Sequence, residues 1–85
     1  MRVVVRGDVQ GVGFRLAAAE RARARGISGF VRNRGDGAVE AAFEGEPEAV
    51  DALVDWSRRG PRGARVDEIE IEAEAPQQDA GFRIR

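Results

Sequence analysis

The sequence predicts a single α+β domain in which an antiparallel sheet carries two helices on one face. Three observations lead to this fold class. Short segments rich in β-branched or alternating apolar residues interleave with two segments of helical composition, in the order βαββαβ. Glycine or proline separates each segment from the next, and no linker, repeat or low-complexity stretch interrupts them. The length of 85 residues suits one small domain, residues 1–85, and is too short for two.

The first strand is expected at residues 1–7, because the segment MRVVVRG is short, valine-rich and bounded by glycine. Residues 14–25 follow as a helix of good or fair helix formers. Its candidate buried stripe repeats every four residues and comprises Phe14, Ala18 and Ala22. Gly26 is placed to end this helix in a left-handed conformation, so that Ile27 packs back on the last turn.

A hairpin is predicted next, with strands at residues 28–33 and 38–45 joined by a turn at residues 34–37 (RGDG). The Asp-Gly pair in this turn supplies the positive φ values that tight turns need. In the second of these strands the apolar residues alternate with Glu40 and Glu44. We therefore expect both glutamates to face water. The core face of the same strand is expected to carry Val39, Ala41 and Phe43.

The second helix is expected to begin within residues 45–48 (GEPE), where proline suits the first helical position and the acids suit the positive end of the helix dipole. Its apolar face consists of Val50, Leu53, Val54 and Trp56. The Gly-Pro pair at residues 60–61 ends it. Residues 65–74 then alternate isoleucine with glutamate, but Val66 is out of phase, so the strand starts after Val66 or carries a bulge. Residues 82–84 close the chain as a short final strand.

A glycine-bearing loop joins the first strand to the first helix and is the candidate functional site. Gly11 and Gly13 allow backbone conformations that side chains forbid, so successive N–H groups can point into one concavity. The start of the helix directs its unpaired N–H groups and its positive dipole end to the same place, and Arg15 adds a planar charged fork suited to phosphate. By itself such a loop is more often a plain turn, and Arg15 is what favours an anion site. Because Asp8 would repel a bound anion, we expect its side chain to point to solvent.

The topology brings Asn33 near this loop. In a ferredoxin-like βαββαβ sandwich the first two strands run in the same direction, and the third lies between them antiparallel. Their C-terminal ends therefore share one edge of the sheet, where Arg15 follows the first strand and Asn33 ends the second. A phosphate-binding arginine and a neutral amide thus form a candidate two-residue site. Without that pairing, Asn33 would be interpreted as a turn residue before the hairpin.

The amino-acid composition excludes most other kinds of catalytic and metal site. The chain contains no cysteine and no histidine, which excludes disulfides, thiol redox chemistry, Ser/His and Cys/His nucleophilic pairs and the common zinc sites. The net charge of −1 provides no basic field for nucleic acid, and all 14 basic residues are arginine, which we attribute to compositional bias. No apolar run approaches the roughly 20 residues of a membrane span, and no signal peptide opens the chain. We therefore expect a cytoplasmic protein, and we expect it to be a monomer.

The motifs GDVQGVGFR, GFVRN, DGAVE and WSRRGP, with a final FRI, resemble acylphosphatase along almost the whole chain. The resemblance implies hydrolysis of acyl phosphates to a carboxylate and inorganic phosphate, with no metal and no cofactor. It implies that Arg15 binds the phosphoryl group together with the loop backbone, and that Asn33 orients the attacking water. The loop amides that it implies are those of Val9, Gln10, Gly11, Val12, Gly13, Phe14 and Arg15. The expected partners are an acyl phosphate and, as product or inhibitor, phosphate or sulfate, with no nucleic acid and no membrane.

This chemistry suits the residues present. A carboxylate is a good leaving group, so little general acid is needed, and phosphoryl transfer depends mainly on positioning and on stabilising charge. Neither Arg15 nor Asn33 can act as a base. We therefore expect a phosphate oxygen of the substrate to accept the proton of the water.

Other functions remain open from the sequence. Larger hydrogenase-maturation carbamoyltransferases carry an acylphosphatase-like module with a similar loop, so a carbamoyl-phosphate-handling domain is one alternative. A noncatalytic phosphate-binding or RNA-binding module of ferredoxin-like fold is another. RNA stacking would need exposed aromatic residues on the central strands, where the sequence has Val3, Val5, Val39 and Ala41. A metal site in the glutamate row of residues 68–74 is disfavoured, because alternate spacing keeps these acids solvated and apart.

Overall fold

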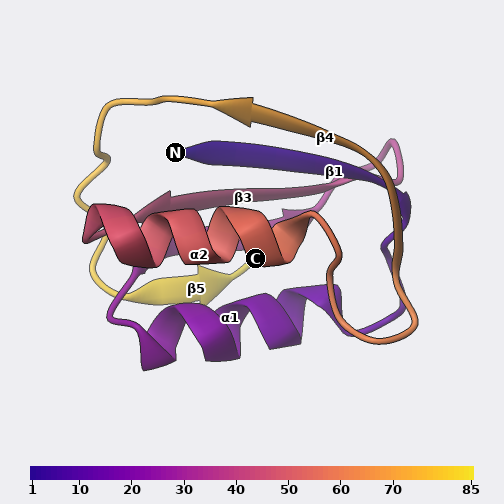
Figure 1. Ribbon diagram of the computed structural model, residues 1–85, viewed down its shortest axis with the longest axis horizontal. Coiled ribbons are helices and arrows are strands. Elements are labelled where there is room, and N and C mark those ends of the chain that lie inside the picture. Colours follow the sequence, from indigo (N-terminus) through magenta and orange to yellow (C-terminus); the bar gives the residue numbers. More distant parts are fainter.

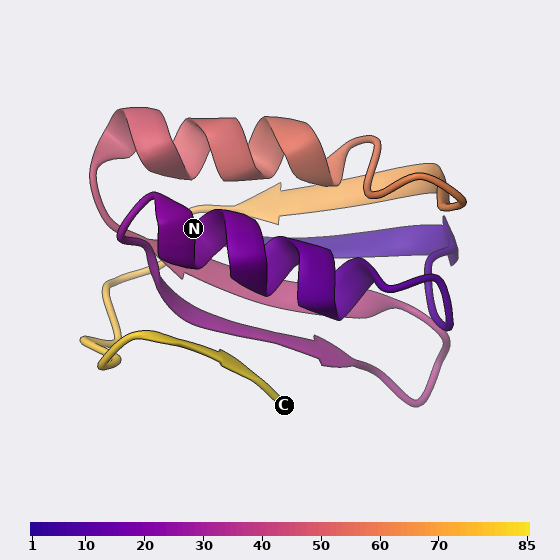
Figure 2. The same ribbon diagram turned by 90° about the horizontal axis from the view of Figure 1, so that it is seen from below.

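The computed structural model describes residues 1–85 and has a five-stranded sheet and two helices (Figure 1). Along the chain the elements are β1 (Arg2–Asp8), α1 (Phe14–Ala24), β2 (Ser28–Asn33), β3 (Val39–Glu44), α2 (Pro47–Ser57), β4 (Arg65–Glu72) and β5 (Phe82–Ile84). Figure 2 shows both helices on one face of the sheet, while the opposite face carries no helix. The fold is therefore the predicted α+β sandwich of ferredoxin-like type.

The strand order in the sheet is β4-β1-β3-β2-β5. As predicted, β3 lies antiparallel between β1 and β2, so the C-terminal ends of β1 and β2 meet at one edge. The four longer strands form the predicted antiparallel sheet, and the short final strand β5 joins its edge by pairing in parallel with β2. Residues 73–81 carry the chain from β4 at one side of the sheet to β5 at the other, so β5 runs opposite to β4 and alongside β2.

The hydrophobic core lies between the sheet and the two helices. The predicted stripe of α1 is buried, and the predicted end of the helix is confirmed by the left-handed conformation of Gly26, whose φ is +69°. The N–H of Ile27 donates to the carbonyl of Ala22 at 2.9 Å, which satisfies a carbonyl of the last turn. The predicted core residues of β3 and α2 are all buried: Val39, Ala41, Phe43, Val50, Leu53, Val54 and Trp56.

A β-bulge in β4 confirms the phase change expected at Val66. The register between β1 and β4 shifts between Arg6 and Gly7, so that Val66 pairs with Gly7 and Asp67 is the extra residue. The bulge lets Val66 and Ile69 both pack against the core. Gly7 has φ +137°, and a Cβ atom there would lie 2.2 Å from the Arg65 carbonyl oxygen. The close approach of the two strands therefore requires glycine.

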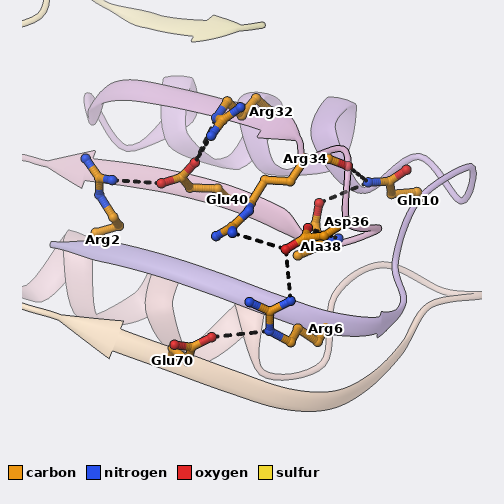
Figure 3. A network of polar contacts seen from close by, with 9 residues as sticks. All are labelled: Arg2, Arg6, Gln10, Arg32, Arg34, Asp36, Ala38, Glu40 and Glu70. Carbon is orange, nitrogen blue, oxygen red and sulfur yellow. Dashed lines mark hydrogen bonds and ion pairs between the residues drawn. The ribbon is translucent and has the colours of Figure 1, made fainter.

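The expectation that Glu40 faces water was wrong. Its residue exposure is only 5%, because arginines on both neighbouring strands cover it. Arg2 Nη1 lies 2.8 Å from Glu40 Oε2, and Arg32 Nε donates to Glu40 Oε1 at 2.7 Å (Figure 3). Arg32 stands directly opposite Glu40 in the β2–β3 register, which explains the contact. Glu44 is half-buried and accepts hydrogen bonds from the backbone N–H groups of Gln77 and Gln78.

The aliphatic residues of the central strands, contrary to expectation, do not lie on the face that would stack against RNA. Val3, Val5, Val39 and Ala41 belong to the buried core, so they say nothing about the open face. That face instead carries the arginine and glutamate pairs of Figure 3. Its aromatic residue, Phe30, is covered by Arg85, whose guanidinium carbon lies 3.9 Å from the ring centroid. Neither helix has the length and apolar character needed to cross a membrane.

Candidate active site

The loop between β1 and α1 has the backbone geometry expected of an anion cradle. Gly11 and Gly13 adopt left-handed conformations with φ +75° and +79°. Gly13 is the N-cap of α1, and its carbonyl accepts the first helical hydrogen bond, from the N–H of Ala17 at 3.0 Å. The first turn of α1 contains no acidic residue and has no side-chain cap. The positive end of the helix dipole is therefore not offset by a carboxylate of its own.

The backbone N–H groups of residues 9–16 donate to no acceptor in the protein, neither backbone nor side chain. The carbonyl of Gly13 is the first carbonyl to accept a helical hydrogen bond in α1. The N–H groups of the first turn, which precede Ala17, therefore have no partner within the helix. The side chain of Val9 is buried in the core and anchors the start of the loop. The loop thus offers a continuous run of donors, and such a run suits an anion.

A cavity of about 250 Å³ lies against this loop. It brings together Arg15 and Asn33, as the shared direction of β1 and β2 predicted. The residues that line it are Val9, Gly11, Gly13, Phe14, Arg15, Leu16, Asn33 and Ile84. Gln10 and Val12, although part of the predicted cradle, do not line this cavity. Asp8 is exposed at the end of β1, as expected, and is not part of the lining.

Arg15 and Asn33 are both half-buried and both have free hydrogen-bonding capacity. Arg15 forms no ion pair with an aspartate or glutamate, and its one protein partner is the main-chain oxygen of the last residue, Arg85, to which Nη1 donates at 3.1 Å. By contrast, Arg2 and Arg32 both pair with Glu40, and Arg2 also pairs with Glu74. The side-chain amide of Asn33 makes no hydrogen bond to another protein group. A cation and an amide thus remain available for a ligand.

The side chain of Gln10 ties the loop to the β2–β3 hairpin. Its Nε2 donates to the carbonyls of Arg34 at 2.8 Å and of Ala38 at 3.0 Å (Figure 3). Arg34 follows Asn33 directly, so this link fixes the loop relative to the end of β2. The sequence indicates a role only for the backbone N–H of Gln10, and this side-chain contact was not predicted. No local pattern reveals a contact between residues so far apart in the sequence.

The hairpin is itself braced by Asp36. The N–H of Ala38 donates to Asp36 Oδ1 at 3.1 Å, and Asp36 Oδ2 lies 3.2 Å from Arg6 Nη1 and 3.1 Å from Arg34 Nη2 (Figure 3). The hydrogen bond from Ala38, with the help of Arg6, holds the pKa of the Asp36 carboxyl below its ordinary value. The turn that follows Asn33 is therefore held by side chains from both β1 and the loop.

The arrangement can bind an anion and orient a small polar molecule beside it. The cavity lining contains no carboxylate, and the chain has no histidine or cysteine, so no side chain at the cavity is suited to remove a proton. No group of three or more acidic, histidine or cysteine side chains is arranged to hold a metal ion. Anion binding and positioning are thus what the lining residues can contribute to catalysis.

Sequence comparison relates the whole chain to one protein family. A family model described as acylphosphatase matches residues 1–84. The acylphosphatase of Anaeromyxobacter dehalogenans is 54% identical over 85 residues, which cover 99% of this chain and 91% of that protein. The acylphosphatase of Thermococcus kodakarensis is 49% identical over 78 residues, which cover 92% of this chain and 86% of that protein. The similarity thus extends over nearly the full length of each chain.

Comparison with solved structures relates the chain to the same family. The crystal structure of acylphosphatase from Bacillus subtilis superposes with a TM-score of 0.91 at 35% identity, covering 99% of this chain and 94% of that chain. Full-length HypF, in its phosphate- and nucleotide-bound form, superposes with a TM-score of 0.89 at 28% identity. That match covers 99% of this chain but 11% of HypF, so it concerns one module of a much larger protein.

Proposed function

Because the chain belongs to the acylphosphatase family, we propose that it hydrolyses the carboxyl-phosphate bond of acyl phosphates with Arg15 and Asn33 as its catalytic pair. The assignment of these two residues rests on one observation. A run of backbone N–H groups without protein partners, an arginine without a carboxylate side chain as partner and an amide without a hydrogen bond surround one cavity. Such a set of donors matches a phosphoryl group and a water molecule beside it.

The loop and Arg15 bind the phosphoryl group. Backbone N–H groups of residues 9–15 and the guanidinium fork of Arg15 donate to its nonbridging oxygens, where negative charge is concentrated in the transition state. These donors are already in place before substrate binds, because Val9 anchors the loop in the core and Gln10 fixes it to the hairpin. Loss of one preorganised donor of this kind costs about 100-fold to 1,000-fold in turnover.

Asn33 orients the attacking water. The side-chain oxygen accepts a hydrogen bond from the water and so holds it beside the phosphoryl group. The water oxygen then forms a bond to phosphorus while the bond from phosphorus to the carboxyl oxygen breaks. The leaving carboxylate takes the electron pair of the broken bond. Positioning of this kind replaces general-base catalysis, because the amide of Asn33 is not a base.

A phosphate oxygen of the substrate accepts the proton from the water. The products are then a carboxylate and inorganic phosphate that carries both protons of the water, so atoms and charge balance. The absence of a carboxylate from the cavity lining supports this route. A pH–rate profile governed by an enzyme carboxylate, and abolished when that carboxylate is replaced, would contradict it.

Carbamoyl phosphate, the substrate of the alternative module considered from the sequence, is the second candidate, and the match to HypF shows that a module of this fold also occurs inside a larger protein. Identity to HypF is 28%, against 54% for the acylphosphatase of Anaeromyxobacter dehalogenans. The match to HypF also covers a small fraction of that protein, whereas the match to the bacterial acylphosphatase covers 91% of it. These differences favour acyl phosphates, and carbamoyl phosphate is the second candidate.

The test is hydrolysis of benzoyl phosphate by the wild type, Arg15→Ala and Asn33→Ala. Arg25→Ala is the matched control, because Arg25 lies exposed at the other end of α1, without an ion pair or side-chain hydrogen bond. We expect turnover by the wild type and Arg25→Ala and a loss of about 100-fold or more in the other two variants. No turnover by folded wild-type protein would reject the activity, and equal turnover in all four proteins would reject the site.

A further inference from the structure

Large apolar side chains converge on the mouth of the cavity. The exposed large hydrophobic residues of the protein are Leu16 (57%), Ile71 (39%) and Ile84 (39%). Two of them, Leu16 and Ile84, line the cavity that holds Arg15 and Asn33, whereas Ile71 lies on the edge strand β4. Scattered exposed apolar residues are ordinary on a protein surface. Two that meet at a cavity with polar groups form the combination typical of a small-molecule site.

Both apolar residues are held next to the phosphoryl-binding group. Leu16 follows Arg15 in the first turn of α1, and Figure 1 shows β5, which contains Ile84, beside this helix. The N–H of Arg85 donates to the carbonyl of Val31 at 2.9 Å, and the main-chain oxygen of Arg85 accepts the hydrogen bond from Arg15. The end of β5 and the guanidinium of Arg15 are therefore fixed to each other, which keeps Ile84 at the cavity.

The charges around the cavity restrict what the apolar wall can bind. Arg15 is the only charged side chain in the lining, and a bound phosphoryl group would pair with its guanidinium. The guanidinium of Arg85 is placed over the ring of Phe30 and does not contribute to the lining. An acyl group that carries its own charge would thus find no counter-charge here and would have to lose part of its hydration.

We propose that Leu16 and Ile84 form the subsite for the acyl group and that the enzyme prefers acyl phosphates with an uncharged, apolar acyl group, aromatic or aliphatic. This inference rests on the proposed function, since it takes the phosphoryl group to be bound by the loop and Arg15. The acyl group is one oxygen atom away from phosphorus and must then lie at the remaining wall of the cavity, which Leu16 and Ile84 provide. Contact with them removes apolar surface of the substrate from water.

The test compares kcat/KM for benzoyl phosphate and for acetyl phosphate, which share the reacting group and differ in apolar area. The variants are Leu16→Gln and Ile84→Thr, which keep helix and strand propensity, and Leu16→Met, which keeps the apolar surface. Ile71→Thr is the matched control, because Ile71 has the same exposure as Ile84 and lies outside the cavity. We expect the benzoyl-to-acetyl ratio to fall about five-fold to ten-fold in Leu16→Gln and in Ile84→Thr. Leu16→Met and Ile71→Thr should keep the wild-type ratio.

An unchanged ratio in Leu16→Gln would overturn the subsite while leaving the proposed function intact. The same conclusion would follow if Ile71→Thr lowered the ratio as much as Ile84→Thr does. Lack of turnover of both substrates by the wild type would instead reject the proposed function. Because Leu16 is mostly exposed, Leu16→Gln should fold, and inhibition by benzoate against acetate gives a second reading of the same subsite in that variant.

Discussion

Replacement of Gln10 by alanine should loosen the phosphate-binding loop from the hairpin that follows Asn33. Gln10 makes two hydrogen bonds, from Nε2 to the carbonyls of Arg34 at 2.8 Å and Ala38 at 3.0 Å. A net contribution of about 0.5–1.5 kcal/mol for each gives a range of about 1–3 kcal/mol in the free energy of unfolding. The lower part of this range applies, because both carbonyls keep another partner.

These remaining partners are backbone groups of the turn. The Arg34 carbonyl also accepts from the N–H of Gly37 at 3.2 Å, and the Ala38 carbonyl from the N–H of Arg34 at 2.8 Å. Neither carbonyl is left without a hydrogen bond in Gln10→Ala, so we expect a loss of about 1–2 kcal/mol. For a domain of this size that corresponds to a fall of roughly 4–16 °C in Tm. Gln10→Glu should lose more, because a carboxylate oxygen would then face two carbonyl oxygens.

Urea denaturation measures the change in the free energy of unfolding, and a phosphate titration of the same proteins measures the affinity of the loop for the anion. Gln77→Ala is the control, because the Gln77 side chain makes one exposed hydrogen bond, to the Ala75 carbonyl at 3.1 Å. We expect Gln10→Ala to bind phosphate more weakly than the wild type and Gln77→Ala to bind it equally well. Stability of Gln10→Ala within about 0.5 kcal/mol of the wild type, together with unchanged phosphate affinity, would refute this reasoning.

Three further predictions concern ligand binding, backbone geometry and pH. Phosphate at about 100 times its Kd should stabilise the wild type by about 2.7 kcal/mol, and Arg15→Ala should lose most of that effect in a thermal-shift titration; an equal shift in both proteins would contradict this. Gly7→Ala should destabilise the fold by about 2 kcal/mol or more in urea denaturation, because its Cβ would lie 2.2 Å from the Arg65 carbonyl oxygen at φ +137°; a wild-type Cm would contradict this. The pKa of the Asp36 carboxyl is lower in the folded than in the unfolded protein, so its ionised form stabilises the fold at pH values above the unfolded-state pKa. This contribution to stability should be lost as the pH falls through the folded-state pKa, because the unfolded chain binds the proton at a higher pH than the folded chain does. Stability of Asp36→Asn should therefore fall less on acidification than that of the wild type, and parallel curves would count against it.

Local patterns predicted most of the fold. Gly26 was expected in a left-handed conformation because a helix-forming segment ends there, and its φ of +69° agrees. The phase change at Val66 predicted the bulge, since a period of two residues cannot continue through it. The directions of β1 and β2 followed from the element order alone. These features depend on neighbours in the sequence or on general rules of connection.

Contacts between distant segments were harder to predict. Alternation along β3 indicated a solvated Glu40, but burial of its carboxylate depends on Arg2 and Arg32 of the two adjacent strands. The parallel pairing of β5 with β2 depends on the path of the connection from β4, which no local pattern specifies. For the same reason the sequence indicated Arg15 and Asn33, whereas the structure added the Gln10 side chain and the apolar wall.

The most direct test of the central claim separates binding from turnover in Asn33→Ala. If Arg15 and the loop bind the phosphoryl group while Asn33 orients the water, this variant should bind phosphate with nearly wild-type affinity. Its kcat for benzoyl phosphate should fall by about 100-fold or more. Wild-type kcat in Asn33→Ala, or a loss of phosphate affinity as large as that in Arg15→Ala, would contradict the division of roles between the two residues.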